Sequence, residues 1–303
     1  MGINRRQALQ AAGLAGITAA TASSAIAQAP KNTVDPSFRI KNNRIKQSVM
    51  GWCFNSKPNP MSGIEVAKAC KSIGIPAIEG ISAKDYPAVR ELGLEISLVG
   101  SHGFKKGPVD PENHAEVIEK LKAGIDLAVE VKCPSVITFT GMSKADIDSD
   151  TAKKNCVDAW KQVMGYAEKH NINLVLEHLN SRDDSHPMKG HPGYFGDDVD
   201  LCVELINAVG SKNMKLLFDV YHVQIMNGDV IRRIRQNKDL IGHYHTAGNP
   251  GRKELDDEQE INYPAIMREI LKTGYTGYVA QEFIPTWDDK VLALRYSAMV
   301  CDV

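Results

Sequence analysis

The sequence predicts an α/β protein in which eight parallel strands close into a single (β/α)8 TIM barrel. Apolar runs of strand length alternate with amphipathic runs of helical length from about residue 45 to the C-terminus. Such alternation indicates a parallel sheet whose strands are joined by helical crossovers. Eight repeats in about 260 residues also fit the size of a closed barrel. A third observation agrees with this fold: four successive strands in the second half each end on a polar side chain.

The expected strands are short apolar runs between the helix-like segments, as is typical of strands buried on both faces of a parallel sheet. In chain order they span 45–52, 77–79, 95–99, 135–140, 174–177, 216–219, 240–245 and 278–282.

The expected helices follow from the spacing of their apolar residues. Ile64, Ala67, Cys70 and Ile73 share one helical face, and a short helix after them ends at Gly93. Apolar residues in the second half recur at the same helical spacing. The expected helices span 62–73, 85–92, 113–131, 152–170, 198–209, 229–236 and 263–272.

An open, doubly wound sheet is the alternative arrangement of the same elements. It is the weaker prediction, because no G-x-G-x-x-G motif follows the first strand. No internal repeat, low-complexity segment or linker divides the chain after its N-terminal segment. We therefore expect one barrel domain from residue 40 to residue 303.

The N-terminal segment has the composition of an export signal. Arg5 and Arg6 precede a weakly apolar stretch at 11–22, and the small residues at 25–27 suit a cleavage site. The paired arginines resemble a twin-arginine signal over residues 1–29, which predicts an exported, periplasmic protein. A disordered or amphipathic helix is the alternative. The stretch is too short and too rich in small residues for a good membrane span. Cleavage after residue 27 would take the net charge from −1 to −3, since it removes two arginines and no acid.

Composition places the rest of the chain among soluble globular enzymes. The full sequence of 303 residues is 43% hydrophobic and 24% charged, its formal net charge is −1, and no basic tract stands out. We therefore expect no nucleic-acid partner and no membrane association after signal cleavage. The six cysteines form no C-x-x-C pair, and most lie in apolar patterns, so buried free thiols are expected.

The four polar strand ends predict a metal site. Glu177, Asp219, His245 and Glu282 close the fifth to eighth expected strands. The active site of a barrel enzyme lies at the C-terminal ends of its strands, so these side chains can converge on one point. Each residue alone could instead form an ion pair at the barrel mouth. Together they form an oxygen-rich set that suits one Mn²⁺, Mg²⁺ or Co²⁺ ion and tolerates Zn²⁺.

The two glutamates add a means of moving protons. Glu177 and Glu282 lie on opposite sides of the expected metal. A hydroxyketone bound to a metal has acidic C–H bonds, because the ion stabilises the enediolate oxygens. One carboxylate could take a proton from one carbon, and the other could return a proton elsewhere. The pattern does not decide which glutamate is the base.

Motifs around these residues resemble the hydroxypyruvate isomerase family of the xylose isomerase-like TIM barrel superfamily. The resemblance is specific from about residue 173 to 285 and general before that. It is carried by E-H-L-N at 177–180, D-V-Y-H-V-Q at 219–224, H-Y-H-T-A at 243–247, P-G-R-K-E at 250–254, E-I-N-Y at 260–263 and G-Y-T-G-Y at 274–278.

The resemblance implies an aldose–ketose type isomerase that interconverts hydroxypyruvate and tartronate semialdehyde. Glu177 and Glu282 would be metal ligands and the acid/base pair, and Asp219 would be the third ligand. His245 stands where hydroxypyruvate isomerases often carry glutamine and related ketose 3-epimerases carry histidine. A ketose 3-epimerase or a 3-keto-sugar lyase is therefore the alternative. An endonuclease IV-like enzyme and a non-catalytic sugar-binding barrel are weaker ones.

Four further residues are expected to bind the sugar or hydroxyketone substrate. The resemblance implies that His222 reaches substrate oxygens and that Arg252 binds a hydroxyl or carboxylate, which suits its forked donors. Glu254 would hold Arg252 in place. His102 and Asn180 follow the third and fifth strands and are weaker candidates from their positions alone. The resemblance also allows a homo-oligomer, since family members often form dimers or tetramers.

Overall fold

The computed structural model describes residues 34–185 and 188–303, and it has the eight strands that the sequence predicts. They are β1 Lys46–Val49, β2 Ala77–Ile78, β3 Glu95–Ile96, β4 Ser135–Thr138, β5 Asn173–Glu177, β6 Met214–Asp219, β7 Ile241–Thr246 and β8 Tyr278–Gln281. The predicted signal at 1–29 lies outside the described residues and stays a prediction. The predicted first strand is too long, because Trp52 lies in the short 3-10 helix Gly51–Asn55.

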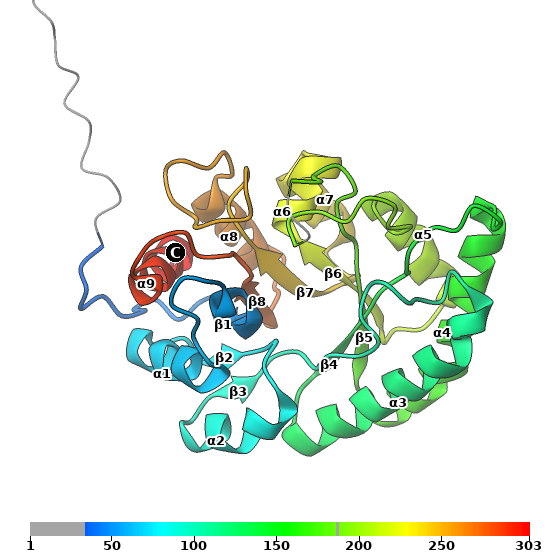
Figure 1. Ribbon diagram of the computed structural model, residues 1–303, viewed down its shortest axis with the longest axis horizontal. Helices are drawn as coiled ribbons and strands as arrows, with labels where there is room; N and C mark the ends of the chain where they lie inside the picture. The colour runs from blue at the N-terminus through cyan, green and yellow to red at the C-terminus, as the bar shows by residue number, and fades with distance from the viewer. Residues whose placement is uncertain (1–33, 186–187) are drawn as a thin grey trace, which may run out of the picture. The chain divides into compact units, whose positions relative to one another are not determined.

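The strands follow one another around a ring. One parallel sheet has the order β1-β8-β7-β6-β5-β4, and β2 pairs with β3 in a second. Parallel bridges from Met50 to Glu79 and from Val99 to Val136 join the two sheets at both edges. Figure 1 shows the resulting ring, with the helices outside it. The predicted TIM barrel is therefore confirmed.

Nine α-helices cover the outside of the described barrel. They are α1 Gly63–Ile73, α2 Tyr86–Glu91, α3 His114–Val131, α4 Ser149–Lys169, α5 Val199–Val209, α6 Val220–Met226, α7 Val230–Asn237, α8 Tyr263–Lys272 and α9 Lys290–Cys301. Short 3-10 turns at Ala83–Asp85 and Pro111–Asn113 precede α2 and α3. Helices α6 and α9 are additions to the prediction. Residues 220–224 belong to the D-V-Y-H-V-Q motif, and α6 follows β6 without a loop.

Side-chain caps fix where helices begin. Ser62 and Glu65 form a reciprocal capping box at the start of α1, in which each side chain accepts a hydrogen bond from the other residue's backbone N–H. Asp219 is both the last residue of β6 and the N-cap of α6. Its Oδ1 accepts a hydrogen bond from the backbone N–H of Tyr221 at 2.8 Å. The α6 cap thus fixes the orientation of a predicted metal ligand.

The N-terminal and C-terminal strands meet at one seam of the ring. Strand β1 pairs with β8 in register from Lys46 opposite Tyr278 to Val49 opposite Gln281. The Asp302 carboxylate, just after α9, accepts hydrogen bonds from the backbone N–H groups of residues 41 and 42. The segment that leads into β1 and the segment that follows α9 therefore stabilise each other.

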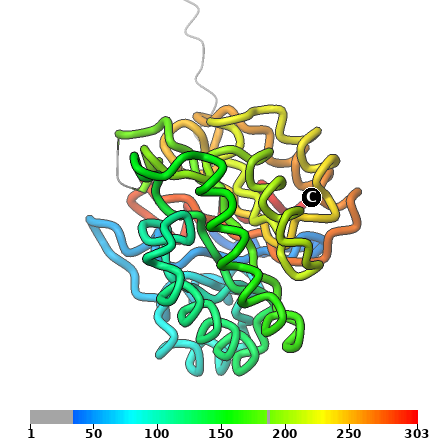
Figure 2. The backbone as a smooth tube through the Cα atoms, turned by 90° about the vertical axis from the view of Figure 1, so that its right-hand side faces the viewer, coloured from blue at the N-terminus to red at the C-terminus, as the bar shows by residue number. Residues whose placement is uncertain are grey.

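The core lies between the strands and the helices. Helices α3 and α4 run side by side on the outside of the barrel (Figure 2). All six cysteines are free and buried, as predicted. Among the described residues, no helix is both long and apolar enough to span a membrane.

We expect Trp160→Ala to be among the most destabilising changes in the core. Trp160 on α4 is fully buried, and its indole N–H donates to Thr138 Oγ1 at 3.0 Å. Truncation leaves a large cavity and removes this hydrogen bond, which should cost about 3–5 kcal/mol of unfolding free energy. Chemical denaturation monitored by circular dichroism measures the loss. Val129→Ala, at an exposed position on α3, is the control and should change stability by less than about 0.5 kcal/mol. Equal losses in the two variants would contradict this account of the core.

Candidate metal and substrate site

The four predicted ligands come together at the C-terminal ends of neighbouring strands. One ligand atom from each of Glu177, Asp219, His245 and Glu282 lies within 4.8 Å of the others. All four side chains are buried. We call these residues the strand-end cluster.

The sheet itself produces this convergence. Glu177 and Asp219 are the last residues of β5 and β6, and Asp219 lies in register with His245 on β7. Glu282 directly follows β8, and its backbone N–H donates to Thr246 O at 2.8 Å, which continues the β7–β8 ladder. Parallel strands end at one rim of a barrel, so their terminal side chains share one space.

Two cationic side chains offset part of the charge of the three carboxylates. His245 Nδ1 lies 2.7 Å from Glu282 Oε2 and 3.2 Å from Glu177 Oε1. Arg252 Nη2 lies 2.7 Å from Glu282 Oε2. Burial alone would raise the pKa of Glu282, but the neighbouring Arg252 and His245 lower this pKa to about 2. Glu282 is therefore a carboxylate in this arrangement.

The carboxyl groups of Asp219 and Glu177 have less positive compensation than that of Glu282, so their negative charge is unfavourable. Burial, and then the neighbouring Glu282, raise the pKa of Asp219 to about 7 and also raise the pKa of Glu177. Asp219 Oδ2 has no hydrogen-bond partner among the described residues. Buried carboxylates are expensive unless a positive group compensates them. The cluster therefore has both the donor set and the uncompensated charge that suit a divalent ion, and its oxygen-rich composition fits Mg²⁺ or Mn²⁺ well.

Arg252 is held rigidly against this cluster. It follows Gly251 in the loop after β7, has a positive φ of 53°, and is almost fully buried. Its Nη1 donates to Met188 O at 2.5 Å, and its guanidinium lies 5.6 Å from the ring centre of Trp52. The prediction that Glu254 holds Arg252 is wrong. The Glu254 carboxylate instead accepts from the backbone N–H groups of residues 286 and 287.

His222 presents one free ring nitrogen to the cluster. Its Nδ1 accepts a hydrogen bond from the backbone N–H of Asn180 at 3.1 Å, so its other nitrogen, Nε2, carries the proton of the neutral ring. Burial, and then Arg252, lower the pKa of His222 well below its usual range. Its Nε2 lies 3.5 Å from Asp219 Oδ2 and has no hydrogen-bond partner among the described residues. A neutral N–H donor thus faces the site.

Asn180 organises the loop after β5. Its side-chain Nδ2 donates to Lys189 O at 2.8 Å, and its Oδ1 accepts from the backbone N–H of Asp183 at 3.0 Å. It also contacts His222 Nδ1. These bonds use the polar atoms of its side chain, so the structure places Asn180 behind His222 and not on the pocket wall.

His102 also lies off the pocket wall. Its Nδ1 lies 2.8 Å from Lys106 O, and its Nε2 lies 3.0 Å from Thr138 Oγ1. Both ring nitrogens therefore have partners within the protein. Its neighbours Ser101, Gly103 and Phe104 line the pocket instead.

A pocket of about 300 Å³ opens onto the cluster. Glu177, Glu282 and Arg252 form its polar end. The remaining wall is mostly apolar, and it comes from several strand ends and from the loop after β5. It is lined among others by Trp52, Leu98, Phe104, Ile137, Phe139 and Met188. Such a wall with few convergent polar groups is typical of a small-molecule site.

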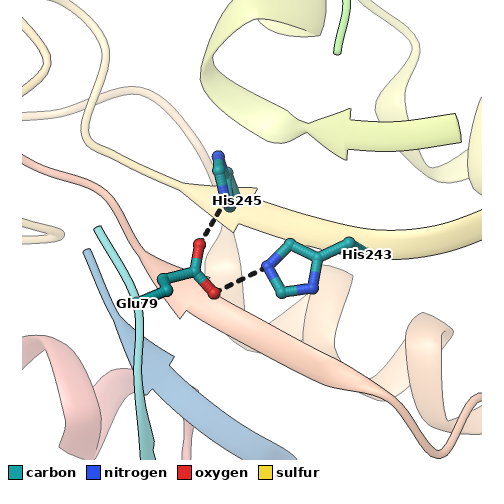
Figure 3. A group of neighbouring side chains, drawn as sticks. All are labelled: Glu79, His243 and His245. Atoms are coloured by element: carbon teal, nitrogen blue, oxygen red, sulfur yellow. Dashed lines mark hydrogen bonds and ion pairs between the residues drawn. The ribbon is translucent and has the colours of Figure 1, made fainter. Parts of the chain in front are cut away.

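Two further residues, His191 and Glu79, lie at the site or directly behind it. His191, in the loop after β5, is buried and lines the pocket. Glu79, directly after β2, contacts both His243 and His245 (Figure 3). The alternation His-x-His on one strand was a usable signal, since residues two apart share a face of the sheet.

Comparisons with known proteins agree with the fold and the motifs. The family model described as xylose isomerase-like TIM barrel matches residues 67–295. A 2-oxo-tetronate isomerase of Pectobacterium atrosepticum is 28% identical over 230 residues, which are 72% of this chain and 85% of the relative. A hydroxypyruvate isomerase of Escherichia coli is 28% identical over 175 residues, which are 58% of this chain and 65% of the relative.

A solved structure supports the fold alone. The 3-keto-D-glucoside 4-epimerase of Escherichia coli superposes with a TM-score of 0.69 at 19% identity, covering 85% of this chain and 98% of that one.

Proposed function

The chain belongs to the xylose isomerase-like TIM barrel family and is an isomerase, and from this premise we propose that it uses one divalent metal ion to isomerise a small hydroxyketone. The observation that carries the proposal is the strand-end cluster, in which three buried carboxylates and an imidazole offer ligand atoms within 4.8 Å of one another. The pocket beside it supplies an entrance of small-molecule size.

Glu177, Asp219, His245 and Glu282 would hold the ion. When bound, it would polarise the carbonyl and hydroxyl oxygens of the substrate and so acidify the adjoining C–H bond.

Proton transfer is the task of the two glutamates. One carboxylate of the pair Glu177 and Glu282 removes a proton from carbon, which leaves an enediolate. The other returns a proton to the neighbouring carbon, while the hydroxyl proton passes to the former carbonyl oxygen, so that the carbonyl and hydroxyl groups change places. Both side chains line the pocket, whereas Asp219 does not, so the two glutamates are the acids that a substrate in the pocket would meet.

His222 and Arg252 would orient the substrate. The guanidinium of Arg252 lines the pocket and can bind a hydroxyl or carboxylate. His222 does not line the pocket, so its Nε2–H would reach a substrate oxygen only where the substrate extends to Asp219, which lies 3.5 Å from that nitrogen. The apolar wall would exclude water, which protects the enediolate from side reactions.

Hydroxypyruvate is the first candidate substrate, with tartronate semialdehyde as product, since a relative carries that activity in its name. A larger ketose or 3-keto-sugar is the second candidate. The pocket favours it, because a volume of about 300 Å³ with aromatic walls leaves room beyond a three-carbon chain.

A substrate screen tests the proposal. Purified protein is stripped of metal, reloaded with Mn²⁺, Mg²⁺ or Co²⁺, and assayed with hydroxypyruvate, free ketoses and 3-keto-glycosides. We expect metal-dependent isomerisation of at least one hydroxyketone, followed by NMR of the products. The metal-free protein is the control. Equal turnover with and without metal would contradict the proposed metal dependence, and turnover confined to sugars would favour the second candidate.

A further inference from the structure

A buried carboxylate lies directly behind one predicted metal ligand. Glu79 follows β2, is fully buried, and points across the barrel interior to β7. Its Oε1 lies 2.8 Å from His245 Nε2, and its Oε2 lies 3.0 Å from His243 Nε2 (Figure 3). The structure thus joins Glu79 to the strand-end cluster through a single imidazole.

Hydroxyl groups fix the orientation of this carboxylate. Ser97 Oγ donates to Glu79 Oε2 at 2.5 Å, and the hydroxyls of Ser97 and Ser48 lie 2.6 Å apart. All three residues are fully buried. Glu79 therefore meets groups from several strands of the barrel, and its two oxygens have little freedom to turn away from the histidines.

The contacts give the two nitrogens of His245 different partners. Nε2 faces Glu79, whereas Nδ1 faces Glu177 and Glu282 in the strand-end cluster. An ionised carboxylate only accepts hydrogen bonds, so the hydrogen shared with Glu79 is carried by Nε2. Nδ1 also faces carboxylates, so it too carries a hydrogen while no ion is bound. It is the ring nitrogen that faces the cluster, so it is the one that would give up its hydrogen and bind an ion there.

We propose that Glu79 is a positioning residue that fixes the ring of His245, so that Nδ1 is the metal-binding nitrogen and Nε2 keeps its hydrogen. The proposal rests on the proposed metal site. A carboxylate partner on the outer nitrogen of a ligating histidine sets the ring orientation and raises the basicity of the ligand.

Binding of Co²⁺ alone, without substrate, tests this role. We compare wild type with Glu79→Ala, which removes the contact, and with Glu79→Gln, whose amide oxygen can still accept from Nε2. We expect the Kd for Co²⁺ to rise about 10- to 100-fold in Glu79→Ala, and less in Glu79→Gln. Glu95→Ala is the control, because its half-exposed carboxylate pairs with Lys46 and makes no recorded contact with the cluster. Its Kd should not change.

Paramagnetic NMR of the Co²⁺-loaded protein detects the Nε2–H hydrogen of His245 directly. A residue that only stabilises the fold would not change the signal of this hydrogen. Wild type should show one strongly shifted, solvent-exchangeable N–H resonance, from Nε2–H of His245, that exchanges slowly. The Nε2–H hydrogen should exchange with solvent faster in Glu79→Gln than in wild type. Its resonance should be lost from the spectrum of Glu79→Ala. If Glu79→Ala does not fold, the exchange rate in Glu79→Gln decides.

The outcomes separate the inference from the proposed function. Wild-type protein that binds no Co²⁺ would overturn the metal site and this inference with it. Wild-type affinity and an unchanged N–H resonance in both Glu79 variants would overturn the inference alone. Two ions per chain, with one lost in Glu79→Gln, would also overturn it, because Glu79 would then be a ligand of a second ion formed with His243 and His245.

Discussion

Glu282→Gln should abolish exchange of solvent deuterium into a bound hydroxyketone. Glutamine has nearly the same shape but cannot take up or release a proton, so an acid/base residue is lost. We expect the exchange rate to fall by about 10²- to 10⁴-fold, the usual contribution of general acid–base catalysis. NMR of the substrate in D₂O, with metal-loaded enzyme, measures the rate.

The metal content of the variant must be measured in the same preparation, because Glu282 is also a predicted ligand. Glu269→Gln is a matched control. Like Glu282, Glu269 is a carboxylate paired with an arginine, so the substitution breaks a comparable ion pair. Arg235 donates to both oxygens of Glu269, at 2.6 and 2.8 Å, on the outside of the barrel. The control should exchange at the wild-type rate. If Glu282→Gln retains its metal and also exchanges at that rate, the acid/base assignment is wrong.

Asp219→Asn should lose the metal while keeping the fold. The two oxygens of Asp219 have different tasks: Oδ1 caps helix α6, and Oδ2 faces the cluster without a hydrogen-bond partner among the described residues. Asparagine is an equally good helix cap, so its amide oxygen preserves the first task. Its NH₂ group cannot ligate a cation, so the second task is lost.

We expect wild type to carry about one divalent ion per chain and Asp219→Asn to bind it at least about tenfold more weakly. Elemental analysis and the rise in Tm on adding Mn²⁺ measure the change, since a ligand that binds only the folded state raises Tm. Without metal the variant should be at least as stable as wild type, because one of three mutually repelling carboxylates is now neutral.

Asp289→Asn is the control for the cap. Asp289 caps α9 through the same pair of backbone bonds, to the N–H groups of residues 291 and 292, and lies on the exposed surface. It should keep both metal and Tm response. An unchanged metal content in Asp219→Asn would remove Asp219 from the ligand set.

The sequence contained enough information to predict the barrel and the cluster because both depend on strand ends. A charge that closes a buried strand is costly, so Glu177, Asp219 and Glu282 stood out without knowledge of the contacts. Parallel pairing then requires that neighbouring strand ends lie together. The roles of these residues in metal binding and proton transfer stay predictions.

The residues that support the site were harder to predict. The contact of Glu79 with His245 joins β2 to β7, which are not neighbours in the ring. It depends on how two side chains meet inside the barrel, which no local pattern reports. The loop after β5 has no periodicity, so the burial of His191 and the placement of Asn180 behind His222 could not be read from it.

The seam between β1 and β8 bears on how the molecule is made. The ribosome synthesises β1 first of the eight described strands and β8 last, and the Asp302 carboxylate that holds residues 41 and 42 follows α9. The ring therefore cannot close until β8 has emerged from the ribosome, and until then the nascent chain exposes the unpaired edge of β1.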